Sequence, residues 1–148
     1  MSKITMRWPD LDLEVACESI EENKTAFELF AANLPVKAVQ GHEMVGGWLL
    51  RSRSVRLLKK PFDIVGSELK KEKMNIAPVG RISLLFPQGS STEVMVKYAE
   101  CVDDREYVPI AQVAKEDVEK LVKAGKAQWK SASRTKEVII VEFSGEGK

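Results

Sequence analysis

A short amphipathic helix between two strands constrains the fold of this chain more than any other feature. Residues 11–17 alternate apolar and polar side chains, which is typical of a half-buried strand. The next apolar residues recur at helical spacing and form one stripe: Phe27, Phe30, Ala31 and Leu34. Thr25 and Glu28 have the spacing of a capping box, so we expect the helix to begin near residue 25. Pro35 is expected to end it, because proline disfavours helical geometry in the preceding residue.

Strand patterns recur along the rest of the chain. Residues 4–8 alternate and stop at Pro9-Asp10, which predicts a hairpin with residues 11–17. Further strands are expected at residues 36–40, 44–50, 81–86, 93–98, 108–114 and 138–143. Between the first two of these, Gly41-His42-Glu43 is interpreted as a turn, and Gly46-Gly47 as a bend or bulge.

The second half of the chain also predicts one helix and two irregular segments. A helix is expected over residues 116–124, with Gly125 as its C-terminal stop. Residues 126–136 are interpreted as a polar connection, residues 57–77 as a long excursion, and residues 144–148 as a frayed tail.

This order of elements resembles that of the small prokaryotic cyclophilin-like proteins. The resemblance is carried by the strand, helix and proline of residues 11–35, by Arg81 to Phe86 followed by Pro87-Gln88-Gly89, and by the strand and helix of residues 108–124. It implies a mainly β fold, a closed antiparallel cyclophilin-like β-barrel with two short helices. It also implies that residues 1–148 form a single domain, with the helix near residues 25–34 covering one end of the barrel.

Composition and charge narrow the classes of partner. A length of 148 residues with 44% hydrophobic residues suffices for one core, and a net charge of +1 disfavours nucleic acid and anionic lipid as partners. No apolar run approaches the roughly 18 residues of a membrane span, and no leader is visible, so we expect a cytoplasmic protein. Cys17 and Cys101 are interpreted as reduced structural thiols. The sequence leaves homo-oligomer formation open.

Basic residues are concentrated between Arg51 and Lys73. This segment contains eight Lys or Arg residues and three acidic ones. It is interpreted either as a contact surface for anionic groups or as a solvated strand edge and loop, in which lysines prevent edge-to-edge association. No aromatic residue is interleaved with these charges, which disfavours a single-stranded nucleic-acid site.

Motifs of several enzyme classes are missing from the sequence. There is no P-loop, dinucleotide fingerprint, nucleophile elbow or His-x-x-x-His pair, and no cofactor is predicted. Of the prolyl isomerase signature only Gln40-Gly41 is present, without the arginine that would stabilise a twisted prolyl amide. Prolyl isomerase activity is therefore not expected.

Six residues are the candidates for a functional site. His42, the sole histidine, and Glu100 are the candidate acids or bases, because both side chains can exchange a proton. The candidate ligand-binding residues are Gln40, Trp48, Arg51 and Tyr98. Each can also be an ordinary turn, edge or core residue. No metal site is predicted.

Two classes of function follow. In the first, the barrel binds a small polar ligand and is a cofactor-free enzyme that condenses an amino acid with a 2-oxo acid. Cucumopine and mikimopine synthases, which are related to the cyclophilin-like family, carry out such imine chemistry, and the resemblance implies it here. In the second class, the chain is a non-catalytic binding or interaction module that uses residues 51–73 as its contact surface.

Overall fold

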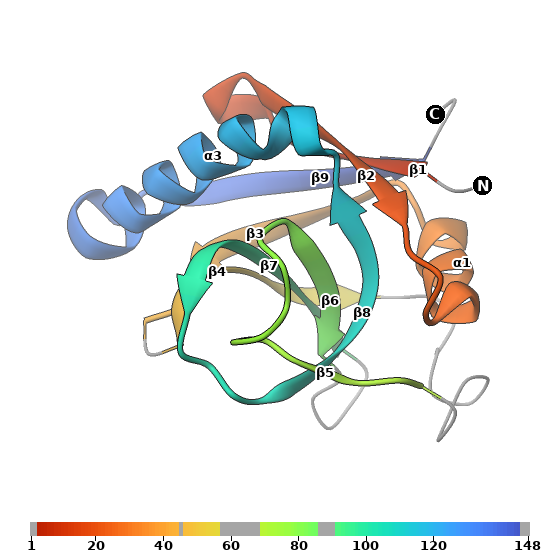
Figure 1. Ribbon diagram of the computed structural model, residues 1–148. Coiled ribbons are helices and arrows are strands. Elements are labelled where there is room, and N and C mark those ends of the chain that lie inside the picture. Colours follow the sequence, from red (N-terminus) through yellow and green to blue (C-terminus); the bar gives the residue numbers. More distant parts are fainter. Residues whose placement is uncertain (1–2, 45, 57–68, 86–90, 146–148) are drawn as a thin grey trace.

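The computed structural model describes residues 3–44, 46–56, 69–85 and 91–145. In chain order its elements are β1 (Lys3–Trp8), η1 (Pro9–Leu11), β2 (Leu13–Ser19), α1 (Lys24–Ala32), β3 (Val36–His42), β4 (Gly47–Arg56), β5 (Glu72–Lys73), β6 (Arg81–Leu85), β7 (Ser91–Cys101), β8 (Glu106–Val113), η3 (Lys115–Asp117), α3 (Val118–Lys130), η4 (Ser131–Thr135) and β9 (Ile139–Gly145). Figure 1 shows α3 lying across one side of the strands and α1 at another.

Within the described residues, eight antiparallel strands close into a barrel. Their order around it is β2, β1, β9, β3, β4, β7, β6 and β8, and β8 returns to pair with β2. β5 is an additional strand that pairs with β8. The predicted mainly β closed antiparallel barrel with two helices is confirmed.

Alternation of side chains along the strands separates the barrel interior from its outer surface. The main core draws residues from all eight barrel strands, with Trp8, Val15, Val96 and Phe143 among them. A second, smaller cluster contains Leu49, Met74, Ala77, Met95, Cys101 and Tyr107. Leu49 and Leu50 are neighbours in β4 yet belong to different clusters, so β4 has apolar contacts on both faces.

The helix α1 buries the apolar stripe that the sequence predicts. Phe27 and Phe30 are almost fully buried, and the ring of Phe30 meets that of Phe143 edge-on at 5.6 Å. The predicted capping box is wrong. The N-cap is Asn23, and its side chain instead bonds to Lys70 on a neighbouring segment, with its Nδ2 donating to Lys70 O and its Oδ1 accepting from Lys70 N.

The helix α3 is longer than predicted, because Gly125 does not end it. Gly125 lies inside α3, where its bare Cα packs against the ring of Tyr98: a Cβ built on it would lie 2.5 Å from the ring carbons. The residues predicted as a polar connection therefore continue as helix and as the π-helical turn η4. The lack of a side chain at Gly125 allows α3 to approach the barrel closely, and the glycine does not end the helix.

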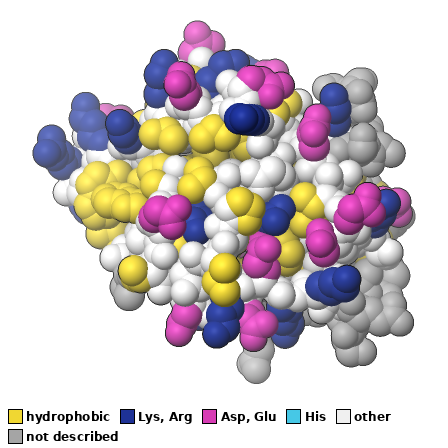
Figure 2. Space-filling view, in the orientation of Figure 1, with side chains coloured by type: hydrophobic (Ala, Val, Ile, Leu, Met, Phe, Trp, Pro, Cys, Tyr) yellow, Lys and Arg dark blue, Asp and Glu magenta, His cyan; other side chains and the backbone are white. Residues whose placement is uncertain are grey.

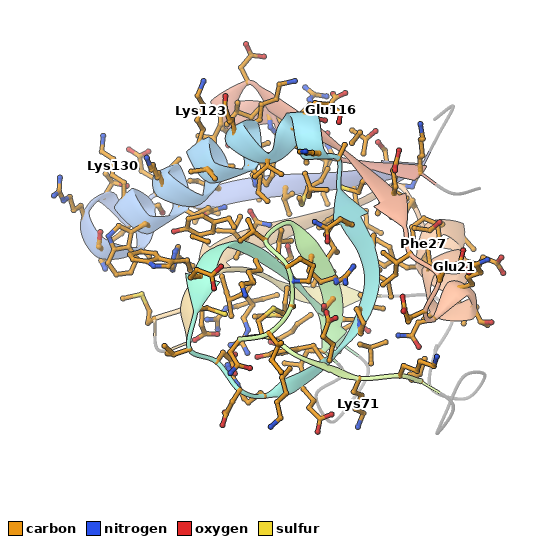
Figure 3. The ribbon with its side chains drawn as sticks, in the orientation of Figure 1. Glu21, Phe27, Lys71, Glu116, Lys123 and Lys130 are labelled. Atoms are coloured by element: carbon orange, nitrogen blue, oxygen red, sulfur yellow. The ribbon has the colours of Figure 1, made fainter. Side chains whose placement is uncertain are left out.

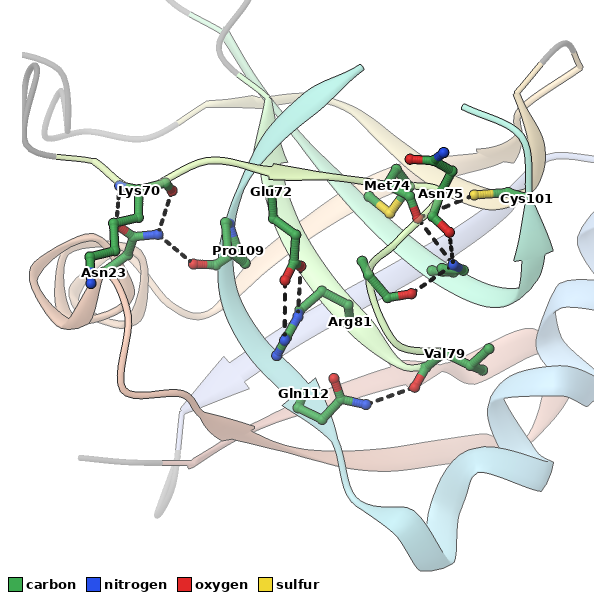
Figure 4. Close-up of polar contacts among 12 residues, drawn as sticks. Asn23, Lys70, Glu72, Met74, Asn75, Val79, Arg81, Cys101, Pro109 and Gln112 are labelled. Atoms are coloured by element: carbon green, nitrogen blue, oxygen red, sulfur yellow. Dashed lines mark hydrogen bonds and ion pairs between the residues drawn. The ribbon is translucent and has the colours of Figure 1, made fainter. Parts of the chain in front are cut away.

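Residues 69–80 form a strap over the outer surface of β6, β7 and β8 (Figure 4). At its start, Asn23 holds Lys70 and Pro109; in its middle, Glu72 accepts from Arg81 at 3.0 Å. At its end, the buried Nζ of Lys97 donates to three carbonyl oxygens of the strap: those of Met74, Asn75 and Ala77 at 3.0, 3.4 and 2.6 Å. The strap is thus bound by polar contacts along its length.

Most of the other expected elements are present, and the differences lie in the residues at which they begin or end. β7 extends to Cys101 and thus beyond the predicted strand, and Gly46-Gly47 does precede a register irregularity between Gly47 and Leu49. His42 was expected in a turn, but it is the last residue of β3, pairs with Leu50 and is buried. Of the predicted excursion, residues 57–68 lie outside the described residues.

Candidate functional site

The turn between β3 and β4 separates an aromatic cluster from a charged groove. Glu43 N donates to Leu49 O at the base of the turn. Gly46 O accepts from the backbone N–H groups of Val102 and Asp103, which fixes the connection between β7 and β8 against the turn. Residues far apart in the sequence therefore meet at one rim of the barrel.

The aromatic cluster consists of His42, Trp48, Tyr98 and Trp129. The rings of His42 and Trp48 each contact the three other rings edge-on, at centroid distances between 4.9 and 6.2 Å. His42 and Tyr98 are buried, whereas 43% of Trp48 and 38% of Trp129 are exposed. The cluster has a buried polar pair on the inside and two indole rings on the outside.

Both ring nitrogens of His42 are engaged. A carbonyl oxygen can only accept, so Nδ1 donates to Glu43 O at 2.6 Å, and Nε2 accepts from the hydroxyl of Tyr98 at 2.6 Å. Burial lowers the pKa of His42, and burial also raises the pKa of Tyr98 to about 12. Both effects favour a neutral imidazole beside a neutral phenol, an arrangement that positions the turn at Glu43.

This arrangement predicts that His42 titrates below its usual pKa of 6.5. Because the unfolded chain then binds a proton that the folded chain does not, the free energy of unfolding should fall as the pH drops below about 6.5, by at most about 1.4 kcal/mol per pH unit. His42 is the sole histidine, so NMR titration of its imidazole gives the value directly. His42→Gln should remove this part of the pH dependence; a measured pKa above 6.5 would contradict the assignment.

Gln40 lies deeper in the barrel, and its amide is also occupied. Its Oε1 accepts from Trp8 Nε1 at 2.6 Å and from Gln128 Nε2 at 3.0 Å, and its Nε2 donates to Ser52 Oγ at 3.3 Å. These bonds connect β1, β3, β4 and α3. In this structure Gln40 stabilises the junction of the helix with the barrel.

On the other side of the turn lies a groove of about 480 Å³. It is lined by Glu43, Gly46, Val102, Asp103, Asp104 and Arg105. We refer to it as the rim groove. Three carboxylates line it, and the side chain of Arg105 is about half exposed.

Asp103 anchors the basic side of the rim groove. Its carboxylate accepts from the backbone N–H, Nε and Nη2 of Arg105, and from the hydroxyl of Tyr107 at 2.6 Å. Burial alone would raise the pKa of Asp103, but these hydrogen bonds outweigh it and hold the pKa below its usual range. The bond to Asp103 likewise raises the pKa of Arg105, so the guanidinium is fixed and charged.

Arg51 lies behind Glu43, between two carboxylates. Its Nη1 is 3.3 Å from Glu43 Oε2, and its Nε is 3.0 Å from Glu93 Oε2; the three side chains are between 11% and 18% exposed. Glu43 Oε2 and Arg51 Nε are buried, yet neither has a well-aligned hydrogen bond. The charge of Arg51 is therefore balanced by the two glutamates, although Glu43 Oε2 and Arg51 Nε make no hydrogen bond.

The structure brings three of the six predicted site residues into contact: His42, Trp48 and Tyr98, on β3, β4 and β7. Gln40 lies deeper in the barrel and contacts Trp8, Ser52 and Gln128 instead. Arg51 lies on the opposite face of β4. Glu100 is highly exposed, and its carboxylate is 3.9 Å from Lys97 Nζ.

Several residues of the site were missed by the sequence interpretation. Trp129 lies in the segment expected to be a polar connection. If the helical pattern had been continued through Gly125, it would have placed Trp129 on the helix. Glu93 and Arg105 carry no local signal, because only the strand pairing brings them to Arg51 and Glu43. Glu43 follows His42 in the sequence, but its carboxylate lies among the charged residues, 3.3 Å from Arg51 Nη1.

Within the part of the chain that the structure describes, no group of three or more His, Cys, Asp or Glu side chains is placed to hold a metal ion. The two cysteines are free and buried. The same residues include no helix with the length and apolarity required to cross a bilayer.

The fold of this chain is similar to that of solved structures. A structure of McbB in complex with tryptophan superposes with a TM-score of 0.82 at 26% sequence identity, over 98% of this chain. The match covers 45% of the McbB chain, so this chain spans less than half the length of that protein. No family model and no curated protein matches the sequence.

Proposed function

We propose that the barrel binds a small molecule that carries both an amino group and a carboxylate, and that the rim groove is its site. The observation that carries this proposal is the arrangement of Glu43 and Arg105 in one groove, with charges of opposite sign. Glu43 Oε2 has ion-pair contacts with Arg51 Nη1 at 3.3 Å and Arg105 Nη2 at 3.9 Å but no hydrogen bond, and Arg105 is fixed by Asp103 while still half exposed. An ammonium group would donate to Glu43, and a carboxylate would accept from Arg105.

The similarity to McbB supports the class of ligand. That protein was solved in complex with tryptophan, an amino acid, and it shares the barrel over nearly the whole of this chain. In the present chain the indole rings of Trp48 and Trp129 lie on the other side of the β3–β4 turn, so they are outside the groove lining. We therefore assign the recognition of the ligand's charged groups to the groove.

The finer proposal is a cofactor-free condensation of the amino acid with a 2-oxo acid, as in the cucumopine and mikimopine synthases. The amine attacks the keto carbon, the carbonyl oxygen leaves as water, and a nucleophilic atom of the amino acid side chain closes a ring on the imine carbon with loss of a proton. A shielded carboxylate such as Glu43 suits these proton transfers. His42, which donates to Glu43 O, would position it; catalytic roles for His42 and Glu100 themselves stay predictions.

Calorimetry with L-tryptophan, L-histidine and the matched amines tryptamine and histamine tests the binding proposal. We expect the amino acids to bind, and their decarboxylated amines to bind about tenfold more weakly, because the amines lack the group that Arg105 would contact. Glu43→Gln and Arg105→Met should each weaken binding by a similar factor. Arg53→Met is the matched control, because Arg53 is an exposed arginine on β4. Unchanged affinity in both groove variants would contradict the site.

The condensation itself is tested by mass spectrometry. Incubation of the protein with one of these amino acids and pyruvate or 2-oxoglutarate should give a product with the summed mass less one water. Binding without this product would leave the ligand proposal intact and remove the enzymatic one.

A second candidate function, an interaction module that uses residues 51–73, has less support. Arg51 is nearly buried between two glutamates, and residues 57–68 lie outside the described part of the chain. This alternative would be favoured if none of the amino acids bound to the protein while an anionic partner did bind to it. The cytoplasmic location and the lack of prolyl isomerase activity stay predictions.

A further inference from the structure

The outer side of the aromatic cluster is an exposed apolar face. Trp48 and Trp129 are 43% and 38% exposed, and their indole rings contact each other at 5.7 Å. Figure 2 shows hydrophobic side chains gathered on this side of the molecule, next to the C-terminal end of α3. Large aromatic side chains grouped at a surface are typical of a contact with another macromolecule.

This aromatic face has flanks of opposite charge. Residues 126–136, which surround Trp129, contain four Lys or Arg residues and no Asp or Glu: Lys126, Lys130, Arg134 and Lys136. All four are exposed, and Figure 3 shows Lys130 projecting outward from α3. We call this segment the basic flank.

The acidic flank is the segment of residues 100–106 beside the β3–β4 turn. It contains four acidic residues and one arginine, and Glu100, Asp104 and Glu106 are exposed. It is fixed next to Trp48, because Cys101 pairs with Gly47 and Val102 N donates to Gly46 O. The aromatic face therefore lies between a positive and a negative segment.

We propose that a second copy of this chain covers the aromatic face. In a two-fold dimer, each surface meets its own copy, so an apolar centre between a basic and an acidic flank is self-complementary: each basic flank faces the partner's acidic flank. An anionic membrane or an acidic peptide would attract the basic flank but would be repelled by the acidic one. Burial of the tryptophans supplies the stabilisation, and the flanks set the orientation.

Sedimentation equilibrium of the full chain and of two charge-reversed variants tests the proposal. The wild type is expected to show a concentration-dependent dimer. Lys126→Glu with Lys130→Glu, or Glu100→Lys with Asp104→Lys, should each weaken self-association by about tenfold or more, because like charges then face each other. An equimolar mixture of the two variants should restore the dimer as a heterodimer, since each of the reversed flanks then faces a flank of opposite charge.

The mixing experiment also controls for damage to the fold, because a charge-reversed variant that had lost its fold could not form the heterodimer. A wild type that is monomeric at all concentrations would overturn the proposal, and so would a dimer that both charge-reversed variants retain. Binding of a monomeric wild type to vesicles containing phosphatidylserine would overturn it in favour of a lipid surface. The acidic flank shares Asp103, Asp104 and Arg105 with the rim groove, but Glu43 is not part of the flank. Glu43→Gln should therefore weaken amino acid binding and leave the dimer unchanged, which separates the two proposals.

Discussion

Replacing Lys97 with methionine is expected to lower the free energy of unfolding by about 3 kcal/mol. Lys97 is 1% exposed, and its ammonium group donates to the carbonyl oxygens of Met74, Asn75 and Ala77. Methionine has similar length and no donor, so these buried oxygens would lose their partner while the packing of the side chain is largely kept. Chemical denaturation measures the loss.

Lys71→Met is the control for this substitution, because Lys71 lies on the same strap but is exposed. Its effect should stay within about 0.5 kcal/mol. Hydrogen exchange should also show faster exchange in the strap of the Lys97 variant, because its anchoring at that end would be lost. A change below about 1 kcal/mol in Lys97→Met would show that water replaces the ammonium group at little cost.

Replacing Gly125 with alanine is expected to destabilise the protein by about 2 kcal/mol, against the usual preference of helices for alanine. In a helix interior this substitution normally stabilises by up to about 1 kcal/mol. Here the new methyl group would lie 2.5 to 2.6 Å from three ring carbons of Tyr98, so the helix or the ring must move. The buried hydrogen bond from Tyr98 to His42 limits movement of the ring.

A double-mutant cycle separates the two contributions. In the background of Tyr98→Ala the overlap is gone, so Gly125→Ala should become neutral or stabilising. Gly41→Ala is a matched control, because a Cβ at Gly41 meets nothing within 4 Å and the variant should keep the stability of the wild type. Destabilisation of the same size with and without the Tyr98 ring would disprove this account of the glycine.

Sequence periodicity predicted most of the strands and, through the stripe with Phe27 and Phe30, the helix α1. The closure of the strands into a barrel was predicted from the resemblance in element order. The errors arose where a local signal had a tertiary explanation. Gly125 had the sequence pattern of a helix stop, but it lies inside α3, where its small size allows the helix to contact Tyr98. Thr25 had the pattern of a cap, yet Asn23 begins the helix and is held by the strap.

Of the two parts of the candidate site, the sequence predicted residues of the aromatic cluster but not the rim groove. His42, Trp48 and Tyr98 could be grouped from sequence, because each lies at or near the end of an expected strand, and their rings do contact one another. The rim groove could not, since Glu43 and Arg105 lie far apart in the sequence and come together only because Gly46 O accepts from the N–H groups of Val102 and Asp103.

The position of β9 between β1 and β3 determines when the barrel can be completed during synthesis. β9 is the last strand in the described part of the chain, and it pairs with β1 through residues 4–7 and with β3 through residues 36–40. Until it leaves the ribosome, the facing edges of β1 and β3 have no partner from this strand. A nascent chain of this fold therefore carries two open sheet edges until translation of the strand ends, which is the stage at which chaperones would be needed most.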